Sequence, residues 1–213
     1  MLHLFDHPID EQNLDASFAT VAAILFDHWA LEVNGHRFRL SEVEFYYNDA
    51  ADSFDCYAHR HSGHKHQGWR VHGAGIDLAI SSAMRHGGIL LRGMEAEDGE
   101  AYIDGPWKLI SSVFGLLEPG PAENRWALRP YEWPKAESGG FVRGPRVGLH
   151  HRAEVDPAGA MRFAPWRMVR RPIRTKRDRH SLALQMHREG VAAEEIGAVL
   201  GVKARNLARY VEF

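Results

Sequence analysis

Residues 38–48 read FRLSEVEFYYN, and they decide how the rest of the chain is interpreted. Apolar and polar side chains alternate along this stretch with the period of two that a β-strand requires. A strict alternation places Glu42 and Glu44 on the same face as Phe38 and Leu40, while the opposite face also holds apolar residues. The pattern therefore predicts a strand that is buried on both faces and holds two carboxylates inside the protein.

These two glutamates allow two interpretations. A carboxylate inside a protein is unfavourable unless it is paired, hydrogen-bonded or protonated, and such groups gather at functional sites. The alternative is an edge strand whose glutamates face water, and composition alone favours that alternative. The first interpretation predicts chemistry at this strand, and the second predicts none.

The composition is that of a globular chain with room for one domain and a small appendage. It has 213 residues, of which 45% are hydrophobic and 25% are charged. No apolar run of about eighteen residues predicts a membrane-spanning helix, and the first residues, MLHLFDHPIDEQ, lack the apolar segment of a signal peptide. The single cysteine, Cys56, excludes an intrachain disulfide and a cysteine-built zinc site. A cytoplasmic protein in which Cys56 is a packing residue is expected.

Charge is distributed unevenly along the chain. The net charge is −2, but residues 162–213 carry a net +7 and residues 1–161 a net −9. A basic tail on an acidic body suggests a polyanionic partner for the tail. The alternative is a solvated basic segment that binds nothing in particular.

The expected secondary structure mixes helices and strands without a regular β-α-β rhythm. An Asn-Gly pair at 34–35 signals a tight turn, and residues 118–145, rich in Pro and Gly, are expected to form a loop. This order favours the α+β class, with a mixed, largely antiparallel β core and surrounding helices. Helices are expected at residues 10–30 and 104–117, and strands at residues 37–47, 69–81, 87–96, 145–155 and 161–169, the last two as a hairpin turning at 156–159.

The end of the chain has a different composition from the rest. Residues 1–168 are expected to form the main domain, residues 169–178 a basic, proline-containing linker, and residues 179–213 three short helices. The first helix is expected to end at Gly190, because glycine suits a helix C-terminus. The second is expected at about Ala193–Leu200.

These three helices resemble the helix-turn-helix of resolvases and bacterial regulators. In such motifs the third helix enters the major groove of DNA. The residues of this helix that would face DNA are Lys203, Arg205, Asn206 and Arg209. The alternative is a small helical hairpin that packs on the main domain or on another protein.

Residues 42–62, EVEFYYNDAADSFDCYAHRHS, resemble the active-site segment of the alkyladenine DNA glycosylase family. That family has a glutamate, any residue, a tyrosine and then a histidine further along, and Glu44, Tyr46 and His59 take these places. Other segments resemble the family in the same order over residues 38–166. They are RVHGAGIDLAISS at 70–82, GGILLRGMEA at 87–96, GPWKL at 105–109, RVGLHHRAE at 146–154 and MRFAPW at 161–166.

The resemblance implies a monofunctional DNA glycosylase that needs no metal or other cofactor. Its partner would be DNA, expected to be double-stranded, with no obligate protein partner. Glu44 would be the general base that activates water for attack on the deoxyribose, and aromatic side chains would stack on the extruded base. The pocket residues would be Tyr46, His59, Trp69, His72, Asp77 and Ala79, and the DNA contacts of this domain would be Arg92, Lys108 and Arg146.

Some positions bear on which reaction is expected. A lyase step requires an amine nucleophile, and Lys65 is the only lysine near these residues, so no lyase step is expected. His72 stands where the family has a wedge tyrosine, Ala79 where it has an asparagine beside the flipped base, and Asp77 is an additional acid. These departures leave the excised base open, and Trp69 can be either a stacking platform or a core residue.

Two other functions are compatible with the sequence. A metal-dependent nuclease or other hydrolase would use a histidine cluster together with Glu44 or Asp77, since histidine is a common metal ligand. A transcriptional regulator would bind DNA through its C-terminal helices and a small ligand through its larger domain, with Glu44 as a satisfied core group. The histidines of the cluster are His59, His61, His64, His66 and His72.

Overall fold

The computed structural model describes residues 9–49, 55–58, 68–73, 75–80, 85–120, 123–134, 140–203 and 206–207. Over these residues the protein combines one curled antiparallel sheet with five α-helices, which confirms the expected α+β class. The helices are α1 (Leu14–His28), α2 (Pro106–Gly115), α3 (Ala160–Phe163), α4 (Arg179–Arg188) and α5 (Ala193–Leu200), and a 3₁₀ turn, Glu11–Asn13, precedes α1. The strands are β1 (Trp29–Val33), β2 (His36–Asp49), β3 (Trp69–His72), β4 (Gly75–Ala79), β5 (Arg85–Ala96), β6 (Tyr102–Asp104), β7 (Trp126–Pro130), β8 (Val142–Gly144) and β9 (Arg167–Val169).

The sheet is built around β2. Its main path runs in the order β3-β4-β5-β2-β1-β7, while β6 pairs with β5 and β9 joins β2 to β8. The β1–β2 hairpin turns at the Asn-Gly pair, where Asn34 has φ 46° and Gly35 has φ 85°, as a tight two-residue turn requires. Because β2 has neighbours on both sides, the edge-strand alternative for its glutamates is wrong.

An irregularity in β2 explains why glutamates stand among its apolar residues. The register with β5 shifts between Leu40 and Glu42 and again between Glu42 and Val43. A bulge adds one residue and reverses which side chains share a face. The residues of β2 in the main apolar core are therefore Phe38, Leu40, Val43, Phe45 and Tyr47, and the strict alternation expected from the sequence is wrong.

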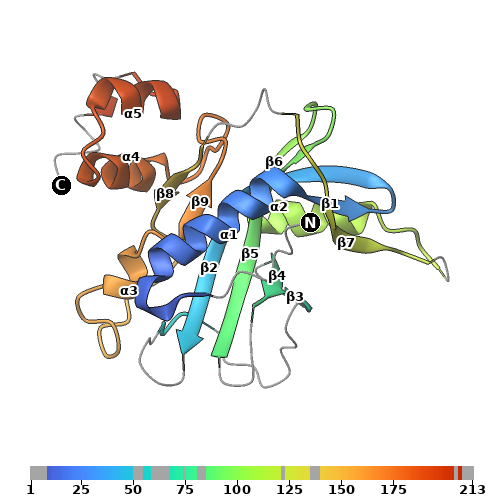
Figure 1. The fold of residues 1–213 in the computed structure, drawn as a ribbon, viewed down its shortest axis with the longest axis horizontal. Coiled ribbons are helices and arrows are strands. Elements are labelled where there is room, and N and C mark those ends of the chain that lie inside the picture. The colour runs from blue at the N-terminus through green and yellow to red at the C-terminus, as the bar shows by residue number, and fades with distance from the viewer. Residues whose placement is uncertain are drawn as a thin grey trace.

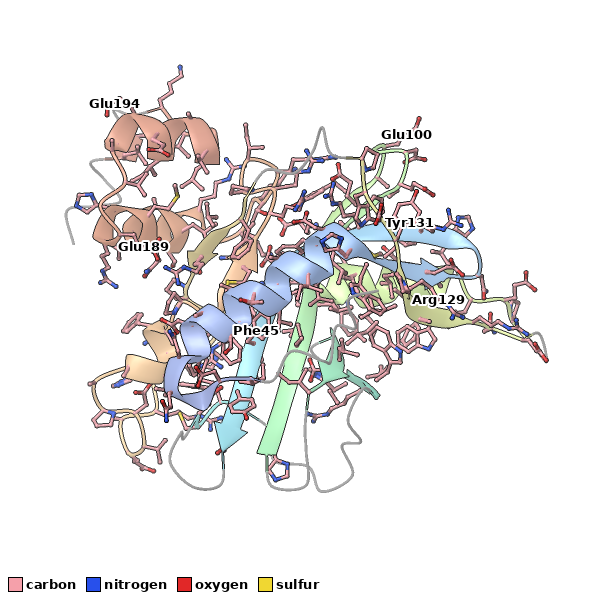
Figure 2. The ribbon with its side chains drawn as sticks, in the orientation of Figure 1. Phe45, Glu100, Arg129, Tyr131, Glu189 and Glu194 are labelled. Carbon is pink, nitrogen blue, oxygen red and sulfur yellow. The ribbon has the colours of Figure 1, made fainter. Side chains whose placement is uncertain are left out.

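Helix α1 covers the apolar face of the sheet. Asn13 caps its first turn by accepting a hydrogen bond from the Ala16 amide at 3.2 Å. The helix runs obliquely across β2 and β5 (Figure 1), and its Phe18 ring stacks on Phe45 with ring centroids 4.5 Å apart. Side chains fill the space between helix and sheet, with Phe45 beneath α1 (Figure 2). The side chains of Glu44 and Tyr46, which alternate with these core residues, therefore lie on the opposite face of the sheet.

The expected hairpin of residues 145–155 with residues 161–169 is wrong. Residues 145–155 form turns without a strand, and the segment that follows them contains α3 and β9. Strand β9 pairs with β2 and β8 instead. The cause is a set of side-chain contacts, described below, that fix residues 146–147 on β2. Strands β1, β6, β7 and β8 were not expected, because short strands beside Pro and Gly leave little periodicity.

The basic segment at 169–178 is attached to the body rather than free. Arg170 pairs with Asp27 at 2.6 Å, Arg171 pairs with Glu95 at 3.1 Å, and Thr175 is fully buried. Acidic residues of the body therefore neutralise part of the basic tail within the molecule, which accounts for some of the charge asymmetry.

Helices α4 and α5 follow the bounds expected from the sequence. They share a second apolar cluster with β8 and β9, in which Leu182, Ile196 and Leu200 are buried. Gly144 lies against Leu182, since a Cβ added there would be 2.7 Å from a methyl group of that leucine. The helical hairpin thus packs on the main domain, and most of the expected third helix lies outside the described residues. Among the described residues no helix is long and apolar enough to span a membrane.

Candidate active site

Glu44 lies at the centre of the polar face of the sheet and is fully buried. Its Oε1 accepts a hydrogen bond from the Val147 amide at 2.7 Å and lies 3.3 Å from Nε of Arg92. Its Oε2 accepts a hydrogen bond from the Tyr46 hydroxyl at 2.9 Å. Both oxygens are held from opposite sides, so the carboxylate has one orientation.

Glu42 has a different role from Glu44. It accepts hydrogen bonds on one oxygen from Nε of Arg92 at 2.7 Å and from Nε of Arg167 at 2.9 Å, and all three side chains are at most 5% exposed. Glu42 therefore compensates the charge of two buried arginines. Because Arg92 contacts both glutamates, its guanidinium is fixed beside Glu44.

Burial raises the pKa of Glu44, and the nearby positive charge of Arg92 lowers it by less. Burial also raises the pKa of Tyr46 well above its ordinary value, and the Glu44 charge adds to this rise. The Tyr46 hydroxyl is therefore a hydrogen-bond donor at neutral pH. A carboxyl with a raised pKa beside a fixed donor is typical of a general acid or base.

The raised pKa of Glu44 predicts a pH-dependent stability. An acid whose folded pKa exceeds its unfolded value stabilises the fold fully below the unfolded pKa, about 4.3, and this contribution is lost as the pH rises through the folded pKa. We expect the free energy of unfolding to fall over this interval in the wild type. Glu44→Gln should lack this decline, which urea unfolding at a series of pH values measures. An identical pH profile in both proteins would contradict the raised pKa.

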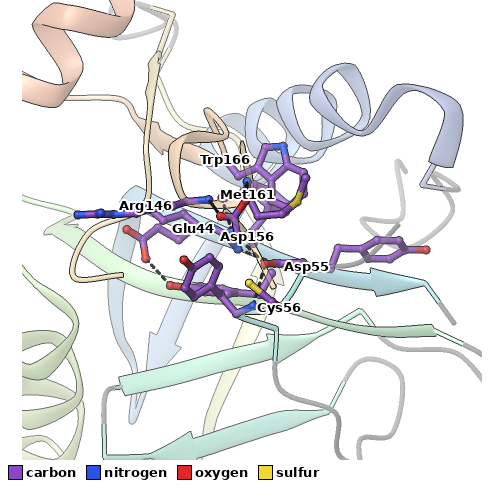
Figure 3. A network of polar contacts seen from close by, with 12 residues as sticks. Glu44, Asp55, Cys56, Arg146, Asp156, Met161 and Trp166 are labelled. Atoms are coloured by element: carbon purple, nitrogen blue, oxygen red, sulfur yellow. Dashed lines mark hydrogen bonds and ion pairs between the residues drawn. The ribbon is translucent and has the colours of Figure 1, made fainter. Parts of the chain in front are cut away.

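A second buried ion pair fixes the loop that holds the Val147 amide. Arg146 and Asp55 are both fully buried and form two contacts, at 2.5 and 3.1 Å (Figure 3). Arg146 also donates hydrogen bonds to the carbonyl oxygens of Phe45, at 3.2 Å, and Met161, at 2.7 Å. The residue before Val147 is thus attached to β2, which places the Val147 amide over Glu44.

These contacts correct two expected DNA contacts. The Arg92 side chain is 5% exposed and that of Arg146 is fully buried, and both are committed to carboxylates. A guanidinium so placed does not reach a phosphate. Arg92 and Arg146 are therefore positioning residues for Glu44 and for its loop.

A pocket of about 220 Å³ opens beside Glu44. Its lining residues include Tyr46, Tyr57 and Gly148, the residue that follows Val147. Glu44 itself lies behind this wall, one hydrogen bond away through Tyr46. The pocket therefore combines aromatic surfaces with a buried carboxylate next to them.

One side of the pocket is formed by β3 and β4. Arg70 and His72 on β3 face Asp77 on β4, and all three line the pocket. His72 Nε2 lies 3.1 Å and Arg70 Nη1 lies 3.9 Å from the same oxygen of Asp77, Oδ2. Tyr46, His72 and Asp77, expected in a pocket from the sequence, thus do lie together.

Other expected pocket residues are placed elsewhere. Trp69 packs against the main core and stacks on Trp126 with ring centroids 5.0 Å apart, which favours the core alternative for Trp69. Ala79 is buried and pairs in the sheet with Gly88, a pocket residue, but it does not line the pocket itself. His59 lies outside the described residues.

The expected DNA contacts beyond the pocket lie on the surface where they are described. Lys108 is exposed in the first turn of α2, and Lys203 and Asn206 are exposed at the end of the chain. Arg205 and Arg209 lie outside the described residues.

Sequence reasoning missed Asp55, Tyr57, Arg167 and the Val147 amide. Asp55 is an acid between apolar residues in the short run FDCY, which is a weak signal of burial. The Val147 amide leaves no signal, because a backbone group looks the same at every position. The residues that orient Glu44 therefore became visible only in the fold.

The described residues contain no group of three or more side chains that could hold a metal ion. Of the five clustered histidines only His72 is described, so the metal-hydrolase alternative stays untested. The chain matches no protein-family model, and no curated protein is significantly similar to it.

Proposed function

We propose that this protein is a DNA glycosylase-like enzyme, which flips a damaged or modified base out of DNA and hydrolyses its N-glycosidic bond without a metal ion. One observation carries the proposal: a fully buried carboxylate, Glu44, is linked by a 2.9 Å hydrogen bond to Tyr46 in the wall of a small aromatic pocket. The resemblance of residues 38–166 to alkyladenine DNA glycosylases supports the same function.

In this proposal the pocket holds the extruded base. Removing a base from the stack costs a few kcal/mol, and stacking on an aromatic side chain returns about 1–3 kcal/mol per base. Tyr46 and Tyr57 both line the pocket. They are the candidates for stacking, in place of Trp69.

Glu44 acts on water in this proposal. Because Tyr46 separates the pocket from Glu44, the attacking water gives its proton to the Tyr46 hydroxyl, which passes its own proton to the Glu44 carboxylate. The water oxygen bonds to the anomeric carbon of the deoxyribose, and the electrons of the glycosidic bond leave with the base. The ionised carboxylate also stabilises the positive charge that develops on the sugar. Arg92 and the Val147 amide bind Oε1 and oppose, without cancelling, the rise in the pKa of Glu44 that burial causes. With no amine in the described site, the reaction ends at the abasic site.

The DNA backbone has a candidate surface next to α2. An open groove of about 510 Å³ is lined by Trp107, whose residue surface is 65% exposed, and by Lys108, Arg174 and Lys176. Basic side chains that line a groove suit a phosphate backbone. The helices α4 and α5, together with the third helix expected after them, would add a helix-turn-helix contact.

Replacing the two lysines of the groove tests this surface. The double variant Lys108→Ala, Lys176→Ala should bind duplex DNA more weakly regardless of sequence, and the slope of log affinity against log salt should become shallower by about 0.9 per lost phosphate contact. Fluorescence anisotropy at several salt concentrations measures both effects. Arg129→Ala, an exposed change on β7, is the control. An unchanged salt slope in the double variant would show that the DNA backbone does not bind in this groove.

The proposal is tested against its two alternatives by metal dependence and truncation. Abasic sites that form in damaged DNA with EDTA present would support the glycosylase. Strand cleavage that appears only after a divalent metal is restored would support the histidine-cluster hydrolase. Deleting residues 203–213, which removes the expected third helix but keeps the segments that pack on the body, should weaken DNA affinity and leave base release, whereas a regulator would retain no activity.

A further inference from the structure

The pocket contains a carboxylate that the proposed chemistry does not use. Asp77 projects from β4 into the pocket, and its side chain is 11% exposed. Both of its close basic neighbours, His72 and Arg70, lie on the side of Oδ2. The two ion-pair contacts of Asp77 therefore both involve Oδ2, and the side chain lines the pocket.

The space next to Asp77 is kept open by a glycine. A Cβ added at Gly88 would lie 3.5 Å from Cβ and 3.6 Å from Oδ2 of Asp77. Gly88 also lies opposite Tyr46 in the sheet, between the carboxylate and the aromatic wall. A flat ring stacked on Tyr46 would therefore present its edge toward Asp77.

An ionised carboxylate accepts hydrogen bonds and donates none. A base with an amino group at that edge supplies N–H donors, whereas a base with a carbonyl group there would bring two acceptors together. Each amino-bearing base also has an acceptor next to the amino group. Arg70 has further N–H groups to offer to that acceptor, because a guanidinium carries five.

We propose that Asp77 is a specificity-determining residue, and that the pocket takes a nucleobase with an exocyclic amino group in preference to its oxo counterpart. The bases concerned are of the adenine, guanine and cytosine types, native or modified, as opposed to hypoxanthine, xanthine and uracil. The inference rests on the proposed function, because it assumes that the pocket receives a flipped base.

Binding in a catalytically silent protein tests the inference separately from base release. The protein is the full chain with Glu44→Gln, with and without Asp77→Asn. The probes are oligonucleotides with one unpaired target base, in pairs that exchange an amino group for an oxo group: adenine and hypoxanthine, cytosine and uracil, guanine and xanthine. Asp98→Asn, an exposed change in the β5–β6 turn, is the charge-matched control.

With Asp77 present, the amino-bearing base of each pair should bind about 10- to 100-fold more tightly. Asp77→Asn should abolish or reverse this preference, because an amide can donate a hydrogen bond to a carbonyl. Equal binding of both bases with Asp77 present, or a preference that survives Asp77→Asn, would overturn the inference. Thermal unfolding of each variant shows whether a loss of binding comes from misfolding. If Asp77→Asn misfolds, Asp77→Ser is used in its place. Failure of the wild type to release any base would overturn the proposed function and leave this binding result to stand by itself.

Discussion

Glu44→Gln should lower the rate of base release by about 100- to 10,000-fold, the usual contribution of one positioned general base. Glutamine keeps the shape of the side chain, and its amide oxygen can still accept from the Val147 amide, which donates to Oε1 in the wild type at 2.7 Å. The fold and the affinity for DNA should therefore persist while the chemistry is lost. Single-turnover release of base from damaged duplex DNA measures the rate, and anisotropy measures the affinity.

Glu42→Gln is the matched control for this loss. Glu42 lies two residues earlier on β2 and is equally buried, but its contacts are with Arg92 and Arg167. Removing its charge leaves buried arginines without full compensation, which typically costs about 3–5 kcal/mol. We expect Glu42→Gln to act on stability first and Glu44→Gln on catalysis first. Full base release by Glu44→Gln would refute the assigned role.

Asp55→Ala should destabilise the protein by about 3–5 kcal/mol, because it leaves the buried guanidinium of Arg146 without its bidentate partner. That is a large share of the 5–15 kcal/mol that typically separates folded from unfolded protein. Asp55 also accepts hydrogen bonds from the amides of Tyr47 and Tyr57, so its loss affects β2 and the pocket wall together. Urea unfolding followed by circular dichroism measures the change.

An exposed ion pair of the same length provides the comparison. Arg125 and Glu123 approach to 2.5 Å, as Arg146 and Asp55 do, but their side chains are 78% and 80% exposed. Water screens such a pair, and surface pairs contribute little. Glu123→Ala should therefore leave the unfolding midpoint nearly unchanged. Similar midpoints for Asp55→Ala and Glu123→Ala would show that the Arg146 contact is not a structural anchor.

Local patterns predicted much of the fold. The apolar spacing of residues 10–30 predicted α1 to within a few residues, and the Asn-Gly pair located the β1–β2 turn. The glycines at 190 and 201 bounded α4 and α5 because both adopt positive φ, at 83° and 64°. Each of these features is set by neighbours within one or two turns of chain.

Features that depend on distant residues were not predictable. The bulge at residues 40–43 is fixed by pairing with β5, so a strict alternation placed Glu42 and Glu44 on the wrong face. Arg146 resembled a DNA contact until its partner, Asp55, was located far away in the chain. Basic residues at 170–174 resembled a linker because their acidic partners, Asp27 and Glu95, lie on other strands and helices.

The central claim is that Glu44 activates water to release a base, and one measurement tests it most directly. Wild type and Glu44→Gln are incubated with plain, alkylated, deaminated and phage-modified DNA in EDTA, and free bases in the filtrate are identified by mass spectrometry. The account predicts one class of free base, with an equal number of abasic sites, from the wild type and almost none from Glu44→Gln. Free base from both proteins at equal rates, or from neither while DNA is still bound, would contradict it.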